Sequence, residues 1–178
     1  QYLFPKAHAV AYVLMAYRIA YCKVHHPKHF YASYFTVRAT DFDYTHVSKG
    51  SHYIKNFIKS VYQQGFRASV QDKSIATYLE LANEMIERGY EFEKVDLYKS
   101  HPTKFLITEK GLRPPLASLA GVGNNAALCI AEARDVNNPF ISREDLRQRA
   151  GIGKSVIERL ADVGVLDDLP ESNQIDLF

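Results

Sequence analysis

The sequence predicts a mainly α-helical protein with one small β-hairpin, and three observations predict it. Apolar residues recur at helical spacing in several stretches, the period shortens only between residues 90 and 112, and a Gly-x-Gly step before a helix occurs twice. With 178 residues, 47% of them hydrophobic, the chain can bury a core and is not disordered throughout. We expect a helical portion (1–66), a connector of one helix and a small β-hairpin (67–112), a tandem helix-hairpin-helix module (113–168) and a short flexible tail (169–178).

The first expected helix runs from Ala7 to Val24, directly after Pro5, a residue that suits the first turn of a helix. Its apolar stretch is long enough to suggest a membrane span, but Arg18, Lys23 and several tyrosines argue against one. We therefore expect no membrane partner and a packed helix of a soluble protein.

Turn and capping residues predict the next two helices. Pro27 starts a helix that reaches about Val37, and Asp43 or Thr45 opens another that ends at Gly65.

The clearest helical pattern in the chain is an apolar stripe between residues 75 and 86. Asp72 or Ser74 is its expected start, and Gly89 its expected end.

A change of period predicts the β-hairpin. Short β-type runs at residues 95–98 and 105–108 are followed by a turn at 109–111, and two prolines then separate this part from the rest.

Residues 119–134 carry the pattern around which the chain is organised. Gly121 and Gly123 can adopt a positive φ and let another molecule approach the backbone closely. A helix that begins just after Gly123, at Asn124, would present free N–H groups and a positive dipole end to a DNA phosphate, without reading a base. Ala127 would keep this helix close to the preceding one.

A second copy of the pattern occurs at residues 151–153, about thirty residues further on, and favours a duplex-binding module. Ser155 and Glu158 predict a capping box for the helix that follows, and Gly164 predicts its end. Five basic residues accompany the two copies: Arg143, Arg147, Arg149, Lys154 and Arg159. The expected DNA-binding residues are Gly121, Gly123, Asn124, Gly151, Gly153 and Lys154.

The charge is unevenly distributed along the chain. Residues 1–70 hold nine Lys/Arg and two Asp/Glu, a net charge of +7, whereas residues 71–178 hold thirteen and eighteen, a net charge of −5. This asymmetry favours a polyanion as the partner of the first part. Cys22 and Cys129 form no disulfide framework, which indicates a cytoplasmic protein, and the first residue, Gln1, suggests a cut from a longer chain without a signal peptide.

Several blocks resemble, in the same order, the C-family replicative DNA polymerases, and most closely the PolC type of bacterial DNA polymerase III α subunit found in Gram-positive bacteria. The blocks are residues 2–9, 25–27, 31–36, 95–100, 119–133, 142–146 and 168–178. The resemblance covers essentially the whole chain and implies that residues 1–66 belong to the fingers of a DNA-directed DNA polymerase. The chain departs from the family at Gly153, which completes a Gly-Ile-Gly step, and at Ile157, which replaces a small residue.

The resemblance also implies DNA synthesis by two-metal phosphoryl transfer, with Mg²⁺ held by palm carboxylates that lie upstream of Gln1. Asp41 and Asp43 have the spacing of a carboxylate pair, but helix capping explains them better. We therefore expect no catalytic residue and no cofactor in this chain, which should be inactive alone.

The fingers would contact the incoming deoxynucleoside triphosphate and the template. The residues that the resemblance implies for this contact are Lys6, His8 and Arg18, because cationic side chains neutralise and grip phosphates. A solvated helix face with a core histidine is the alternative.

The last five residues resemble the peptide by which bacterial polymerases bind the sliding clamp. Leu177 and Phe178 would be the apolar anchors, Ile175 a lesser contact and Gln174 a hydrogen-bonding residue at the rim. The alternative is that Phe178 folds back onto its own domain.

The sequence has two further possible interpretations. Cys22, His25, His26 and His29 have spacings that could suggest zinc, but a proline interrupts the helix, and we expect no metal site. The chain could also be a stand-alone helix-hairpin-helix DNA-binding protein without enzymatic activity, in which residues 1–66 only bind a protein partner.

Overall fold

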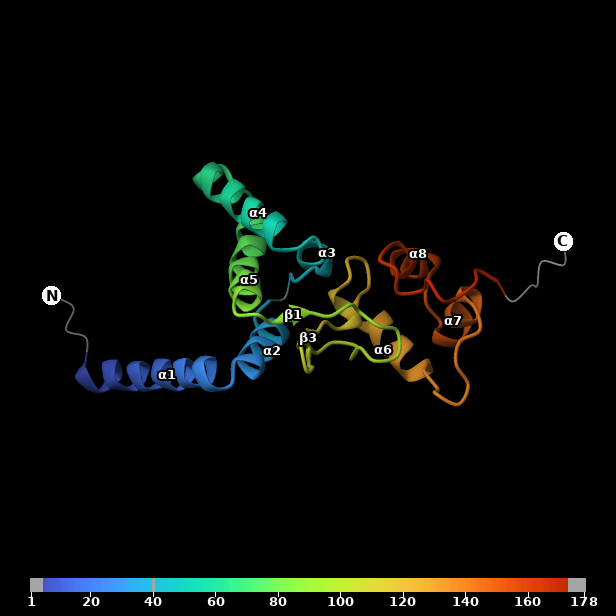
Figure 1. Cartoon of the computed structure of the whole chain (residues 1–178), viewed down its shortest axis with the longest axis horizontal. Helices are drawn as coiled ribbons and strands as arrows, with labels where there is room; N and C mark the ends of the chain where they lie inside the picture. Colours follow the sequence, from blue (N-terminus) through green and yellow to red (C-terminus); the bar gives the residue numbers. More distant parts are fainter. Residues whose placement is uncertain (1–4, 40, 173–178) are drawn as a thin grey trace.

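The computed structural model describes residues 5–39 and 41–172, and it confirms the mainly α-helical class. The α-helices are α1 (Lys6–His25), α2 (Pro27–Val37), α3 (Tyr44–Val47), α4 (Ser51–Gln64), α5 (Val70–Glu87), α6 (Asn124–Ala133), α7 (Arg143–Ala150) and α8 (Lys154–Asp162). Two short 3-10 helices, η1 (Gly65–Arg67) and η2 (Leu116–Ser118), and three strands, β1 (Glu91–Phe92), β2 (Leu106–Ile107) and β3 (Gly111–Arg113), complete the described elements. Figure 1 shows an elongated molecule in which α1 projects at one end and α7 and α8 lie at the other.

Helix α1 differs from the packed helix that the sequence predicts. None of its side chains is buried by another described residue, and nine large hydrophobic side chains on it are 52% to 73% exposed. Among the described residues, α5 contacts the last turn of α1: Lys23 Nζ lies 2.7 Å from a carboxylate oxygen of Glu84, and Arg88 donates to the Lys23 carbonyl. The prediction of a packed helix is therefore wrong within the described part of the chain.

Side-chain caps decide where α3 and α5 begin. The carboxylate of Asp43 accepts a hydrogen bond from the N–H of Thr45 at 2.8 Å and so caps the short helix α3. The prediction of one helix from this point to Gly65 is wrong, because α3 ends at Val47 and α4 begins only at Ser51, after Gly50 with a φ of +85°. Helix α5 begins earlier than predicted, because the Ser69 hydroxyl accepts from the N–H of Asp72 at 2.9 Å. The predicted starts at Asp72 and Ser74 are therefore wrong, since both residues lie inside the helix.

The predicted β-hairpin is confirmed at one strand only. Strand β2 lies within the predicted run at residues 105–108, but its antiparallel partner is β3, which begins in the predicted turn and places Leu112 opposite Ile107. The sequence did not predict β1, which pairs parallel with β3 and places Glu91 opposite Gly111. A Cβ added at Gly111 would lie only 2.1 Å from the Glu91 carbonyl oxygen. A glycine is therefore required where β1 approaches β3.

Residues 95–98, predicted as a strand, form a turn. The Asp96 carboxylate accepts hydrogen bonds from the N–H groups of Tyr98 and Lys99 at 2.9 Å and 2.7 Å. This local bonding gives the backbone an alternative to strand pairing. The apolar residues of the run, Val95 and Leu97, are nevertheless buried.

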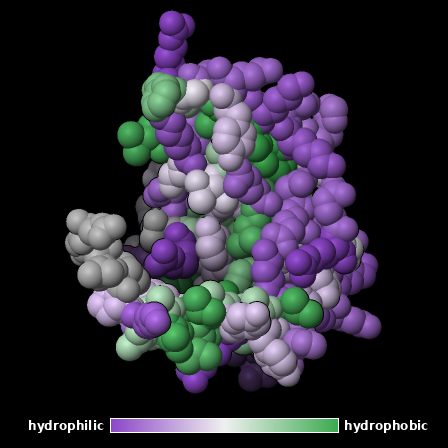
Figure 2. Space-filling model, turned by 90° about the vertical axis from the view of Figure 1, so that its left-hand side faces the viewer, coloured by the Kyte–Doolittle hydropathy of each residue, from purple (hydrophilic) through white to green (hydrophobic). Residues whose placement is uncertain are grey.

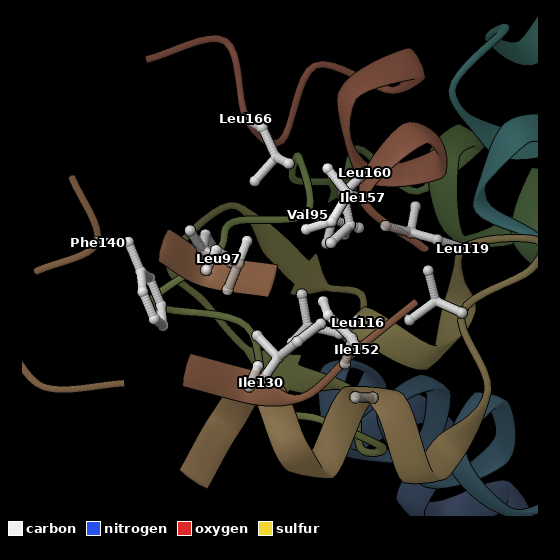
Figure 3. Close-up of a cluster of buried hydrophobic side chains, with 14 residues drawn as sticks. Val95, Leu97, Leu116, Leu119, Ile130, Phe140, Ile152, Ile157, Leu160 and Leu166 are labelled. Atoms are coloured by element: carbon white, nitrogen blue, oxygen red, sulfur yellow. The ribbon is translucent and has the colours of Figure 1, made fainter. Parts of the chain in front are cut away.

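The described residues form two large hydrophobic cores and a small third cluster of Val61, Ala68 and Ala76. The first contains Tyr31, Phe35, Ile54, Leu79, Met85 and Leu112, and so joins α2, α4, α5 and the sheet. The second contains Leu97, Leu116, Leu119, Ile130, Leu146, Leu160 and Leu166, and joins the two glycine loops and their helices (Figure 3). The first core draws residues from both sides of the expected boundary at residues 66 and 67, and the division into four parts stays a prediction.

Candidate nucleic-acid interface

The first glycine loop joins η2 to α6. Gly121 has a φ of +85°, a conformation that side chains with a Cβ rarely adopt, and Val122 points into the second core. Gly123 is extended, with φ −68° and ψ 161°, and is the N-cap residue of α6. The loop thus turns at its first glycine and opens a helix at its second.

The second loop, between α7 and α8, repeats this geometry. Gly151 has a φ of +62°, Ile152 is buried in the second core, and Gly153 is the N-cap residue of α8 with φ −72° and ψ 157°. The two Gly-x-Gly steps therefore share one backbone shape. Positive φ occurs only at the first glycine of each pair, so this part of the expectation for Gly123 is wrong.

The second glycine of each loop has no neighbour that requires a glycine. A Cβ added at Gly123 would meet nothing within 4 Å, and at Gly153 it would meet only the Ser155 hydroxyl, at 3.8 Å. Neither the φ angle nor a packed neighbour among the described residues explains these two glycines. They leave the backbone open on the side from which another molecule would approach.

The helices that follow the loops also lack side-chain caps, so their first N–H groups carry no side-chain acceptor. The predicted capping box of Ser155 and Glu158 is wrong, because α8 already begins at Lys154 and its N-cap is Gly153. Helix α7 differs in this respect, because its N-cap residue Ser142 accepts a hydrogen bond from the N–H of Asp145. The starts of α6 and α8 therefore have the form of anion sites.

Only two of the five basic residues near the loops are free to meet a phosphate. Lys154 opens α8 with its side chain 85% exposed, and Arg159 is 61% exposed; both make only long ion pairs, of 3.7 Å, with acidic residues of their own helix. Arg159 also lies against the first loop, since a Cβ at Gly121 would be 3.2 Å from its Cγ. One cation therefore stands beside each glycine loop.

The other three arginines have structural partners. Arg143 donates to the carbonyls of Leu169 and Leu166, and Arg149 donates to the carbonyls of Ala133 and Asn138. The third, Arg147, pairs with Glu144 at 2.8 Å, and this hydrogen bond lowers the pKa of that carboxyl to about 2. Sequence alone cannot tell the free basic residues from the paired ones, because folding brings the carbonyl groups that bind Arg143 and Arg149 into place.

A groove of about 900 Å³ separates the first glycine loop from the start of α5, and Asp41 and Asp43 line it. Asp41 accepts a hydrogen bond from the Ser74 hydroxyl at 2.8 Å, and Asp43 caps α3. These contacts support the structural interpretation of both carboxylates. Within residues 5–39 and 41–172 no group of three or more His, Cys, Asp or Glu side chains could hold a metal ion.

The structure places Lys6, His8 and Arg18 on α1, all exposed and far from the glycine loops (Figure 1). The ring of His8 meets that of Tyr12 edge-on at 4.5 Å. Lys6 and Arg18 are twelve residues apart, which is about 18 Å along the helix, so one phosphate cannot contact both. The expected clamp residues Gln174, Ile175, Leu177 and Phe178 lie outside the described residues.

The second half of the chain resembles known helix-hairpin-helix proteins. Residues 89–175 match a family model described as a helix-hairpin-helix motif, which contains both glycine loops. No helix in the described ranges combines the length and the apolar character needed to cross a bilayer.

The whole chain then matches one kind of protein. It is 56% identical over all 178 residues to "DNA polymerase III PolC-type" of Halalkalibacterium halodurans and of Caldanaerobacter subterraneus, and 51% identical to that of Bacillus subtilis. The chain spans only 12% to 13% of the length of these curated relatives. It is thus homologous throughout to one segment of PolC-type DNA polymerase III, which confirms the predicted resemblance.

Proposed function

We propose that the chain acts as the C-terminal segment of a bacterial replicative DNA polymerase, in which it binds duplex DNA and contributes fingers contacts. The observation that carries this proposal is the pair of glycine loops with one backbone shape, in a chain homologous over its full length to PolC-type polymerases. The homology also includes residues 1–88, outside the helix-hairpin-helix match. It therefore favours a polymerase segment over a stand-alone DNA-binding protein.

Duplex binding would use the two loops as phosphate clamps. Each would offer the first N–H groups of its helix to a phosphate oxygen, and the glycine at the N-cap would allow the close approach. Arg159 would add a cation at the first loop and Lys154 at the second. Because phosphates carry no base information, the binding would be without sequence preference and sensitive to salt.

The fingers role rests on α1 and on the charge of the first part of the chain. The first acidic residue of the sequence is Asp41, so Lys6, His8 and Arg18 stand on a helix without carboxylates. They would contact the incoming nucleotide and the template at different points along the helix. Mg²⁺ would be held by carboxylates of the polymerase outside this chain. Since the bacterial chromosome lies in the cytoplasm, the proposal implies a cytoplasmic protein.

Attachment to the sliding clamp is proposed for the last five residues, through Gln174, Ile175, Leu177 and Phe178. The sequence of these five residues supports the attachment. The chain after Arg159 also contains five acidic residues and no basic one, and this negative charge would keep the end of the chain away from DNA.

The test is primer extension by the Bacillus subtilis PolC-type polymerase in which this chain replaces the homologous segment. We expect extension by the chimera, and none above background by the 178-residue chain alone. A correctly folded chimera without activity would contradict the proposal. Activity of the chain alone, abolished by Asp41→Asn with Asp43→Asn, would show that the carboxylate pair is catalytic after all.

A further inference from the structure

Helix α1 carries apolar stripes on two opposite faces. One stripe consists of Val10, Val13, Leu14, Tyr17, Tyr21 and Val24, and the other of Tyr12, Met15, Ile19 and Cys22. Val10 and Ile19 illustrate the geometry: nine residues are two and a half turns at 3.6 residues per turn, so the two side chains leave the helix in opposite directions. The edges between the stripes consist mainly of alanines, with Arg18 and His25 on one edge and Lys23 on the other.

Neither stripe is covered by the described residues. Tyr17 and Val24 of the first stripe are 73% and 65% exposed, and Tyr12 and Ile19 of the second are 62% and 54% exposed. Figure 2 views the molecule from the side on which α1 projects and shows apolar side chains in the lower part of this face. Lys23, on the edge between the stripes, pairs with Glu84 of α5.

A helix that is apolar on all sides is typical of the interior of a large protein, whereas a surface helix has one apolar face. The described helices do not meet the requirements for a membrane span. A second copy of the chain could cover one stripe but would leave the opposite one in water. An enclosing partner is needed, and the PolC-type relatives are about eight times longer than this chain.

We infer that α1 is enclosed on both apolar faces by the remainder of the polymerase, leaving the Arg18 edge open. This inference rests on the proposed function. It assigns the two stripes, which begin at Val10 and Tyr12, to internal packing and leaves Lys6 and His8, in the first turn of α1, ahead of both stripes. Between the stripes it makes Arg18 the accessible cation, on the edge where a nucleotide or template phosphate can approach. Lys23 is excluded from that role because Glu84 already pairs with it.

Cysteine alkylation tests the second stripe without any substitution. Cys22 belongs to this stripe and Cys129 lies on α6, and both are exposed in the described structure. In the DNA-free chimeric polymerase, Cys22 should react about tenfold or more slowly than Cys129, because a buried thiol reacts only through local opening. After unfolding in denaturant the two should react alike. Equal rates in the folded chimera would overturn the inference.

The first stripe and the open edge are tested with single thiols placed in a chimera that lacks Cys22. The thiol introduced by Tyr17→Cys should be protected, and that introduced by Arg18→Cys should react as fast as Cys129. A matched control is Val136→Cys, at a linker position that is 88% exposed. Protection of one stripe alone, or of the Arg18 position as well, would overturn enclosure with an open edge. Protected stripes in a chimera that extends no primer would contradict the proposed function and leave the packing inference standing.

Discussion

Gly121 and Arg159 meet across the two glycine loops: a Cβ at Gly121 would lie 3.2 Å from Cγ and 3.6 Å from Nε of Arg159. The glycine belongs to the first loop, and the arginine to α8, which follows the second. The first loop therefore depends on the second hairpin for part of its surroundings. The absence of a side chain at Gly121 both permits its positive φ and leaves room for the arginine.

The two glycines of the first loop should respond differently to alanine. Gly121→Ala should lower the free energy of unfolding by about 1–2 kcal/mol, because its φ is +85° and the new methyl group meets Arg159. Gly123→Ala should cost less than about 1 kcal/mol, since the conformation is extended and the space is empty. Urea denaturation of both variants measures this, and equal losses would contradict the assigned geometry.

The glycine variants with the smallest loss of stability should lose duplex affinity. Gly123→Ala and Gly153→Ala should weaken duplex binding although both variants stay folded, because each methyl group occupies the space that a phosphate backbone would enter. Fluorescence anisotropy with a labelled duplex measures the affinity. Unchanged binding by the double variant would remove the loops from the interface.

Salt dependence should separate the free cations from the structural ones. Lys154→Ala and Arg159→Ala should each reduce the slope of log K against log salt by about 0.9, the value for one phosphate contact. Arg147→Ala is the matched control: its side chain lies in the same hairpin and is also exposed, but pairs with Glu144, so the slope should not change. A smaller slope for Arg147→Ala than for Arg159→Ala would reverse our assignment.

Alkaline pH should destabilise the first core through Tyr31. Burial, followed by the neighbouring Glu84 carboxylate, raises the pKa of this tyrosine from 10.0 to about 12. Because the folded state holds the proton more tightly, its contribution to stability is complete below pH 10 and is lost as the pH rises toward 12. The free energy of unfolding should fall by up to about 1.4 kcal/mol per pH unit for this group.

The control for this prediction is Tyr31→Phe, which cannot ionise at this position. Its unfolding free energy should depend less on pH above 10 than that of the unchanged chain. Identical pH profiles of the two proteins would show that Tyr31 does not titrate in this range.

Deletion of residues 174–178 should abolish binding of the chimeric polymerase to the bacterial sliding clamp, with duplex affinity unchanged. The reason is that Leu177 and Phe178 would supply the apolar anchors for a groove on the clamp. Surface plasmon resonance against immobilised clamp measures the first quantity, and a duplex titration the second. Equal clamp affinity with and without the five residues would rule out this role.

Much of the candidate interface could be predicted from sequence, because glycine loops and caps depend on residues close in the chain. Gly65 and Gly89 end α4 and α5 with positive φ, as predicted, and Ser142 caps α7. The two loops were also found from their pattern alone. The sequence indicated Arg159 only weakly, as a basic residue six positions after the second loop. Its approach to Gly121 could not be predicted, because this contact joins two separate hairpins.

The sequence by itself determined the helical class, the strand β2, the positions of both glycine loops and the kinship with PolC-type polymerases, since these depend on local pattern and on identity along the chain. Only the tertiary structure decided which cations are free, because the carbonyls that bind Arg143 and Arg149 are brought there by folding. It also decided that no element among the described residues covers α1. Burial depends on what the rest of the fold places beside a helix, and hydrophobicity in the sequence does not specify that neighbour.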